Sequence, residues 1–239
     1  MGYRCGDIYL MTYEFNYEFN EQKLVRKLVK EGMTTFDIGA NIGDYSRLFS
    51  SLVGDTGRVF AFEPCQETFV QLLAKNADCS NITSIPKAVF SKNGKVILNE
   101  FPAGCSIWNS IGHPMMVDSN NPNRGIVPIE NSVEVEAVSL DSFCHDFNVE
   151  EIDFMKIDVE GAEIYVLRGA SELLKNKSIR YLQFEISQNM LDGLNTKAKY
   201  VFDFLASKDY KCYTITEDGN VGSRVIDSDS FVENYISYC

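Results

Sequence analysis

The chain has 239 residues, which is enough for one large domain or for a domain with an appendage. Its 45% of apolar and 23% of charged residues are ordinary for a globular protein, and its net charge is −12. Phosphate backbones and anionic lipid headgroups need a basic protein surface. The charge therefore argues against binding of nucleic acids and of membrane surfaces.

The 7 cysteines stand singly along the chain and form no C-x-x-C pair. This pattern is typical of reduced thiols and predicts a cytoplasmic protein without a zinc site. The only histidines, His113 and His145, are too few for a histidine-rich metal site. No apolar run is long enough to span a membrane, and the first residues lack the apolar core of a signal peptide.

Hydrophobic periodicity predicts an alternation of helices and strands along most of the chain. In chain order we expect helix 21–31, strand 35–40, helix 45–52, strand 58–62, helix 68–77, strands 82–89, 95–100, 132–138 and 153–158, helix 163–175, strand 180–186, helix 197–208 and a closing hairpin of strands 210–216 and 221–226. The alternation favours an α/β fold whose mostly parallel sheet carries helices on both faces. Residues 1–34 are expected to form a helical segment packed on a core domain of residues 35–239.

Residues 95–138 interrupt this alternation, because two strands there enclose a span rich in Gly, Pro, Asn and Ser. A long irregular loop inside a compact domain is usually functional or disordered. The stretch from Trp108 to Pro128 holds the only tryptophan, one of the two histidines and two methionines, so we expect a loop that covers the substrate. The Trp108 indole could stack on a sugar ring or pack within the loop.

A glycine-bearing turn follows the first expected strand. Gly39 and Gly43 let the backbone turn tightly and approach a ligand before the next helix begins. Glu63 ends the second expected strand, 20 residues after Gly43, where a carboxylate suits hydrogen bonding to a ribose diol. The pattern therefore predicts an adenosine-type ligand across the first two strands.

The charges around this turn decide between two adenosine-type ligands. No Lys or Arg lies between Glu31 and Ser46, whereas Asp37 and Asp44 flank the turn and would repel a pyrophosphate. The third glycine of the dinucleotide pattern is also absent. A ligand with an ammonium and a sulfonium suits the same charges, which favours S-adenosylmethionine (SAM) over a nicotinamide dinucleotide.

Three segments together resemble the FkbM-type methyltransferases: Phe36 to Ser46, Phe62-Glu63-Pro64, and Ile157-Asp158-Val159-Glu160-Gly161-Ala162-Glu163. The resemblance covers about 36–185, with the motifs in the family's order. It implies a class I, Rossmann-like methyltransferase with a seven-stranded sheet, and typically O-methylation of a sugar or polyketide-type hydroxyl. The residues that it implies for cofactor binding are Asp37, Gly39, Asn41, Gly43, Tyr45, Ser46, Glu63, Pro64, Ala88, Val89 and Asp158.

The three carboxylates of the third segment have different expected roles. Asp158 ends a strand at the edge of the sheet where ligands bind in such folds, so a functional role is favoured. Glu160 lies in the following turn and is open to either role. Glu163 begins a helix, where a carboxylate complements the helix dipole, so capping is favoured for it.

Two further residues complete the candidate site. Glu185 ends the next strand and faces the same crevice, so Asp158 and Glu185 could hold a magnesium or manganese ion, or Glu185 could bond a loop or the substrate. His113 is a candidate general base, because an imidazole suits proton removal at neutral pH. His145 is expected to be structural.

These readings predict a SAM-dependent O-methyltransferase that acts on a sugar, a glycan or a related polyhydroxylated compound. The proton acceptor would be Asp158, Glu160 or His113. Two alternatives stay open: a nicotinamide-dependent oxidoreductase, suggested by the spacing of Gly43 and Glu63, and a SAM-fold interaction module without turnover.

Overall fold

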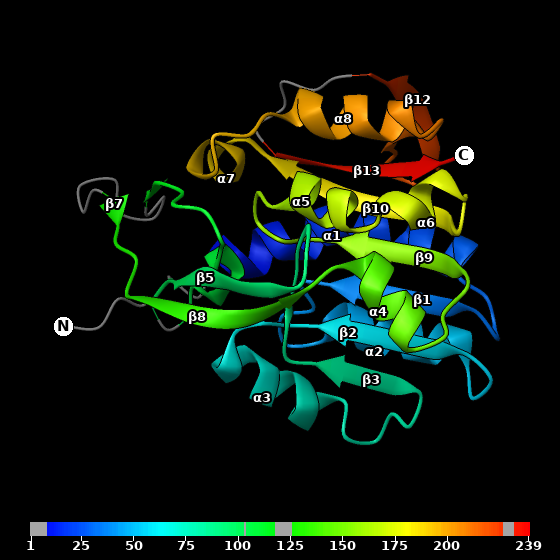
Figure 1. The fold of residues 1–239 in the computed structure, drawn as a ribbon, viewed down its shortest axis with the longest axis horizontal. Helices are drawn as coiled ribbons and strands as arrows, with labels where there is room; N and C mark the ends of the chain where they lie inside the picture. Colours follow the sequence, from blue (N-terminus) through cyan, green and yellow to red (C-terminus); the bar gives the residue numbers. More distant parts are fainter. Residues whose placement is uncertain (1–8, 103, 118–125, 227–231) are drawn as a thin grey trace.

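The computed structural model describes residues 9–102, 104–117, 126–226 and 232–239, and it has an α/β architecture (Figure 1). Its main sheet has eight strands among these residues. In spatial order they are β12 (Val221–Val225), β11 (Lys211–Ile215), β13 (Val232–Tyr238), β10 (Ile179–Ser187), β9 (Ile152–Ile157), β1 (Thr34–Ile38), β2 (Arg58–Phe62) and β3 (Ile82–Ile85).

The strands from β10 to β3 are parallel, and β13 runs antiparallel to both β10 and β11. The sheet thus differs from the expected seven strands. The predicted closing hairpin is present as β11 and β12, but β13 follows it in the chain and lies between β10 and β11. Sequence periodicity missed β13 because its place depends on pairing with strands far away in the chain.

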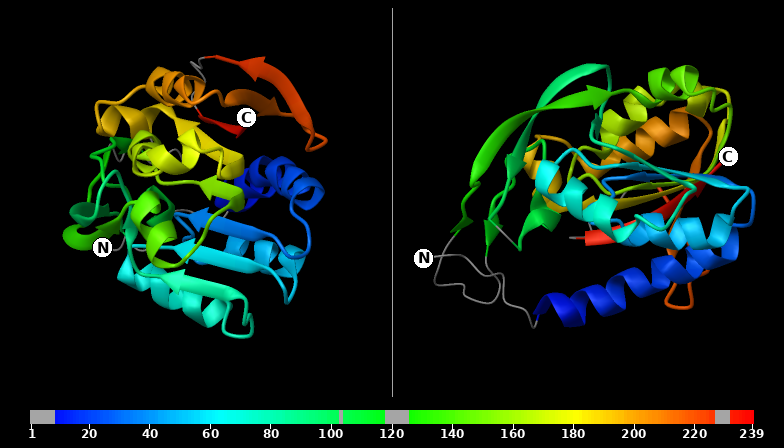
Figure 2. Two further views of the ribbon diagram at one scale, coloured as in Figure 1. Left: turned by 45° about the vertical axis from the view of Figure 1, so that its right-hand side comes forward. Right: turned by 90° about the horizontal axis from the view of Figure 1, so that it is seen from below.

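The helices cover both faces of the sheet, as Figure 2 shows from two sides. On one face, α4 (Leu140–Asp146), α5 (Glu163–Gly169), α6 (Ser171–Lys175) and α8 (Ala198–Ser207) pack on alternate apolar residues of the central strands. On the other face lie α1 (Tyr9–Leu28), α2 (Asp44–Val53) and α3 (Gln66–Lys75). The short helix α7 (Gln188–Gly193) follows β10 directly. The expected single helix 163–175 is therefore two short helices.

Helix α1 is longer than the predicted helix 21–31 and begins at Tyr9. Leu24 and Val25 are buried against Phe49 and Val53 of α2. The Lys23 ammonium donates to the carbonyl oxygen of Glu217 at 2.8 Å, which ties α1 to the turn between β11 and β12. The proposed division of the chain after residue 34 stays a prediction, and residues 1–8 lie outside the described residues.

A second, smaller sheet is made of β4 (Ala88–Val89), β8 (Asn131–Val138) and β5 (Gly94–Glu100). The expected strand 82–89 is wrong as a single element: β3 ends at Ile85, next to Pro86, which has no N–H to donate to a ladder. β5 and β8 form the expected antiparallel pair. Beyond β5 lie a 3-10 turn (Ser106–Trp108) and the pair of β6 (Met116–Val117) and β7 (Ile126–Val127).

The expectation of uniformly reduced thiols is wrong for Cys105, which is disulfide-bonded. The cytoplasmic location stays a prediction. Within the described residues, no helix has the length and apolar character needed to cross a bilayer. The other described cysteines are free: Cys65, Cys79, Cys144, Cys212 and Cys239.

Candidate active site

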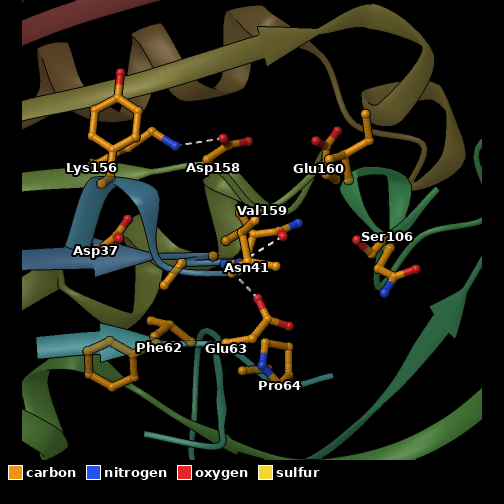
Figure 3. Close-up of a pocket in the computed structure, with 18 of the residues that line it drawn as sticks. Asp37, Asn41, Phe62, Glu63, Pro64, Ser106, Lys156, Asp158, Val159 and Glu160 are labelled. Carbon is orange, nitrogen blue, oxygen red and sulfur yellow. Dashed lines mark hydrogen bonds and ion pairs between the residues drawn. The ribbon is translucent and has the colours of Figure 1, made fainter. Parts of the chain in front are cut away.

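A cavity of about 240 Å³ opens at the carboxyl ends of β1, β2 and β9. Its wall combines the turn after β1, the ends of β2 and β9, the short strand β4 and the segment after β5. In Figure 3, Glu63 and Pro64 lie on one side of the cavity, Lys156 and Asp158 lie on another, and Ser106 lies toward its far end. The predicted cofactor residues that line it are Asp37, Gly39, Asn41, Tyr45, Glu63, Pro64, Ala88, Val89 and Asp158.

The turn between β1 and α2 has a backbone that few residues other than glycine adopt. Gly39 has a φ of +82°, and a Cβ there would lie 1.8 Å from the backbone oxygen of Asp158. Gly43 has a φ of +89° and directly precedes α2, although it does not line the cavity. The side-chain oxygen of Asn41 accepts the Ile42 N–H at 2.8 Å. The turn is therefore fixed against the end of β9, with its backbone at the cavity wall.

Glu63 is held by two backbone amides and is almost completely buried. Its Oε2 accepts the N–H of Asn41 and its Oε1 accepts the N–H of Cys65, each at 2.9 Å. Burial raises its pKa to about 7 despite these two hydrogen bonds. The carboxyl group thus has a fixed orientation at the cavity wall.

Asp37 presents a buried oxygen that has no hydrogen-bond partner. The Ser46 hydroxyl donates to Oδ2 at 2.6 Å, whereas Oδ1 is buried without a partner. Ser46 lies behind Asp37 and does not line the cavity. Burial raises the pKa of Asp37, so the site favours a ligand that brings a positive charge or a hydrogen-bond donor.

Lys156 is a site residue that the sequence analysis missed. Its ammonium lies 2.6 Å from Oδ2 of Asp158 and 4.4 Å from the centre of the Tyr45 ring, and its side chain is 8% exposed. The sequence feature that points to this residue is a lysine inside the apolar run of β9. It stands two positions before Asp158 and therefore on the same face of the sheet. A buried lysine needs a charge partner, which Asp158 provides.

The remaining carboxyl groups lie close to Asp158. Glu160 lines the cavity with a φ of +52°, and its backbone oxygen accepts the Ser110 hydroxyl at 2.6 Å. Burial and the neighbouring Asp158 raise its pKa well above the usual value. Glu163 is buried, and its Oε1 accepts the N–H of Gly161 at 3.0 Å, in the turn before α5 and not in the helix itself.

Glu185 lies beyond the described cavity wall. Asn234 donates to its Oε2 at 3.3 Å, and burial together with Asp158 raises its pKa to about 8. No three His, Cys, Asp or Glu side chains in the described part of the chain gather as a ligand set for a metal ion. Asp158 is paired with an ammonium and Glu185 with an amide, so these residues do not fit a metal-binding pair, and we derive no step through a metal.

The loop after β5 lines the cavity with residues other than Trp108 and His113, the two that the sequence suggests. The residues that line the cavity there are Ser106, Ile107, Asn109 and Ile111. Trp108 packs edge-on against Phe101, with ring centres 6.0 Å apart. His113 is exposed and does not line the cavity, and its backbone N–H donates to the Gly193 carbonyl oxygen at 2.9 Å. The part of the expected covering loop at 118–125 lies outside the described residues.

Comparisons with known proteins show the family through a family model and the fold through a solved structure. A family model described as the methyltransferase FkbM domain matches residues 37–212. The chain is 24% identical over 187 residues to the 2-O-methyltransferase NoeI of Sinorhizobium fredii, with 77% of this chain and 76% of NoeI covered. It is 28% identical over 166 residues to the hexuronic acid methyltransferase AglP of Haloferax volcanii, with 69% of this chain and 60% of AglP covered.

A similar solved structure is that of the methyltransferase FkbM from Methylobacillus flagellatus. The TM-score is 0.51 at 16% identity, and the alignment covers 87% of this chain and 43% of the other. At this identity the likeness supports the fold alone. The predicted Rossmann-like methyltransferase architecture is thus confirmed, apart from the number of strands.

Proposed function

Since this chain belongs to the FkbM methyltransferase domain family, we propose that it transfers a methyl group from SAM to a hydroxyl of a sugar or a related polyhydroxylated compound. The observation that carries the proposal is the cavity itself. It places a fixed carboxyl group, Glu63, and a buried, unpartnered carboxyl oxygen, Asp37 Oδ1, in one wall.

These residues fit the polar groups of SAM. Glu63 would accept the ribose hydroxyls, because both of its oxygens retain lone pairs beside their backbone donors. Asp37 Oδ1 would accept a hydrogen bond from the ammonium of the methionine part. Ala88 and Val89 offer an apolar surface for the adenine. When bound, SAM supplies a methyl group on a positively charged sulfur.

The chain's own part in the reaction is to orient the acceptor hydroxyl and to remove its proton. Holding the reacting atoms in line accounts for a large part of such an acceleration. Asp158 lies at the cavity wall with Oδ2 engaged by Lys156, so its other carboxylate oxygen is the proton acceptor that we propose. Glu160, whose pKa is raised by burial, would act as a hydrogen-bond donor to the acceptor rather than as the base.

A sugar acceptor is supported by the relatives and by the polarity of the cavity. One relative is named as a 2-O-methyltransferase and another as a hexuronic acid methyltransferase. Ser106 and Asn109 add a hydroxyl and an amide to the cavity wall, as recognition of a polyhydroxylated ligand requires. The exposed His113 lies away from this wall and receives no role in the proposal.

Calorimetric titration with SAM and with its demethylated product tests the proposal. The unaltered protein should bind both, and Glu63→Ala should weaken binding about 10- to 100-fold, as expected for loss of hydrogen bonds to a charged group. Glu67→Ala is the matched control, because Glu67 is exposed on α3.

Three results would contradict the proposal in different ways. Binding of NADH without binding of SAM would restore the nicotinamide alternative. SAM binding with no methyl transfer to any neutral or acidic sugar in a glycoside panel would favour a module without turnover. Dependence of turnover on added magnesium or manganese would contradict the metal-free proton transfer described above.

A further inference from the structure

The end of the cavity that we assign to the acceptor is built from two segments far apart in the chain. One is the loop after β5, whose wall residues include Ser106 and Asn109, and the other is the turn after β9, which supplies Glu160. In Figure 3, Glu160 and Ser106 lie toward one end of the cavity and Asp37 lies toward the other. The two segments can hold one acceptor only if they keep a fixed position relative to each other.

Glu160 has a backbone conformation that a glutamate rarely adopts. Its φ is +52°, in the left-handed region, which is unfavourable for a residue with a Cβ. Such residues persist where the surrounding structure holds them, and they cluster at functional sites. The next residue, Gly161, has a φ of +97°, and a Cβ there would lie 2.4 Å from the Met190 carbonyl oxygen. The turn is therefore packed on one side against the backbone of α7.

Ser110 holds the turn from the loop after β5. Its hydroxyl donates to the backbone oxygen of Glu160 at 2.6 Å and accepts the N–H of Gly112 at 3.0 Å. Ser110 is buried, so these bonds do not compete with bulk water. Because Ser110 directly follows Asn109 in the chain, the same contact fixes Asn109 and Glu160 relative to each other in the cavity wall.

Asn99 of β5 fixes Ser110 in turn. The two residues exchange backbone hydrogen bonds of 2.8 Å and 3.1 Å. The fully buried Asn99 side chain donates from Nδ2 to the Gly112 carbonyl oxygen at 2.6 Å and accepts the Ser132 hydroxyl at 2.6 Å through Oδ1. A buried amide that is bonded at both ends specifies one geometry. A chain of hydrogen bonds thus runs from the small sheet to the backbone of Glu160.

We propose that Ser110 is a positioning residue, which holds the Glu160 carboxyl group toward the acceptor, and that Asn99 sets the position of Ser110. Loss of the Ser110 hydroxyl frees the turn to leave its left-handed conformation, which moves the Glu160 side chain away from the acceptor. Neither Ser110 nor Asn99 lines the cavity, so both act through Glu160 and leave SAM binding intact. This inference rests on the proposed methyltransferase function and adds to it two residues outside the cavity wall.

A double-mutant cycle of Ser110→Ala and Glu160→Ala tests this coupling. The probe is the aryl glycoside that the unaltered protein methylates fastest in a panel of neutral hexosides and hexuronides. Ser110→Ala should lower kcat about tenfold, as a small misplacement of a reacting group does, and leave the Kd for SAM unchanged in calorimetry. Glu160→Ala should lower kcat further. In the Glu160→Ala background, Ser110→Ala should change kcat by less than about twofold.

Ser139→Ala is the control for the loss of a buried hydroxyl. Ser139 caps α4, where its side-chain oxygen accepts the Ser142 N–H, and it does not line the cavity. This variant should have a lower Tm, as Ser110→Ala should, but an unchanged kcat. If Ser110→Ala binds no SAM because it does not fold, Ser132→Ala takes its place in the cycle, since Ser132 is exposed. It should lower kcat at least about twofold, and only while Glu160 is present.

Two results would overturn the proposal. An equal fall in kcat in both backgrounds would show that Ser110 acts independently of Glu160. A lower Tm of Ser110→Ala with an unchanged kcat would show that the hydroxyl is purely structural. If the unaltered protein methylates no glycoside of the panel, the proposed function itself is contradicted, and this inference with it.

Discussion

Lys156 places a positive charge at the point where two carboxyl groups meet. Its ammonium is paired with Asp158, and its charge also lowers the pKa values of Asp37 and Glu185 against the effect of burial. A neutral side chain of similar length would leave these carboxyl groups without a counter-charge. Lys156 is thus a positioning residue for the base that we propose.

Replacing Lys156 with methionine should slow turnover and move the acidic limb of the pH–rate profile to higher pH. The reason is that the pKa values of Asp37 and Glu185 rise when the ammonium is lost. Lys156→Arg should restore part of the rate because it keeps the charge. A profile of unchanged shape in Lys156→Met, with a correctly folded protein by circular dichroism, would assign the lysine a purely structural role.

Asp158→Asn should lower kcat by about 10²- to 10⁴-fold, the range for loss of a general base, while SAM binding stays measurable by calorimetry. His113→Ala is the companion variant and should turn over at the rate of the unaltered protein, because His113 is exposed outside the cavity. If the two variants behave the other way round, the base is His113, and the loop that carries it must reach the acceptor.

The sequence predicts those site residues that stand at strand ends. Asp37, Glu63 and Asp158 could be placed in one cavity from strand order alone, because parallel strands bring their carboxyl ends together. Lys156 could not be placed in this way, since its importance arises from the strand register. It lies next to a polar residue on each neighbouring strand. A single sequence contains no direct record of that pairing.

The turn between β1 and α2 illustrates how one element fixes another. Gly39 leaves no room for a side chain, because the end of β9 passes directly over it. The backbone N–H of Asp158 donates to the Ile38 carbonyl oxygen at 2.9 Å, so the packing of β9 against this turn also positions Asp158. Close packing at this point therefore serves both the cofactor turn and Asp158.

Gly39→Ala should lower the free energy of unfolding by about 3 kcal/mol, from the combined cost of a left-handed backbone and an overpacked contact. Gly104→Ala is the matched control. Gly104 has a φ of +85°, close to the +82° of Gly39, but nothing lies within 4 Å of an added Cβ. It should cost about 1 kcal/mol. Equal losses for the two variants in urea titrations would show that the contact with Asp158 contributes nothing.

At the level of elements, the periodicity of the chain predicts the helices and strands of the parallel half well. It fails where tertiary pairing decides the structure. Ala88 and Val89 pair with β8 in the small sheet rather than extending β3, and β13 inserts between two strands that precede it. The disulfide at Cys105 was likewise beyond prediction, because isolated cysteines give no signal of which thiols approach each other.

The whole molecule holds several buried carboxyl groups whose pKa values lie above those of an unfolded chain. Burial raises the pKa of Glu163 from 4.5 to about 7 and that of Glu185 to about 8. Between a pH of 4.5 and a pH of about 8, the folded state therefore binds more protons than the unfolded state. Its stability should fall as the pH rises from about 5 to about 8, the opposite of the behaviour of a salt-bridged carboxylate.

Glu163 supplies the test of this pH dependence, because it is 2% exposed and one of its oxygens has no partner. Its shift corresponds to about 3 kcal/mol lost across that pH range. Glu163→Gln should flatten the profile of unfolding free energy against pH, measured by urea titration, while Glu172→Gln, which changes an exposed carboxylate on α6, should not. A profile that rises with pH in the unaltered protein would refute the expectation.

The place of β13 has a consequence for how the protein is made. During synthesis, β10 and β11 leave the ribosome before the strand that separates them, so the nascent chain holds two open sheet edges until β13 emerges. If β10 and β11 pair with each other first, that pairing must dissolve before β13 can enter. Asn234 lies on β13, so the hydrogen bond that it donates to Glu185 forms only once β13 is in place.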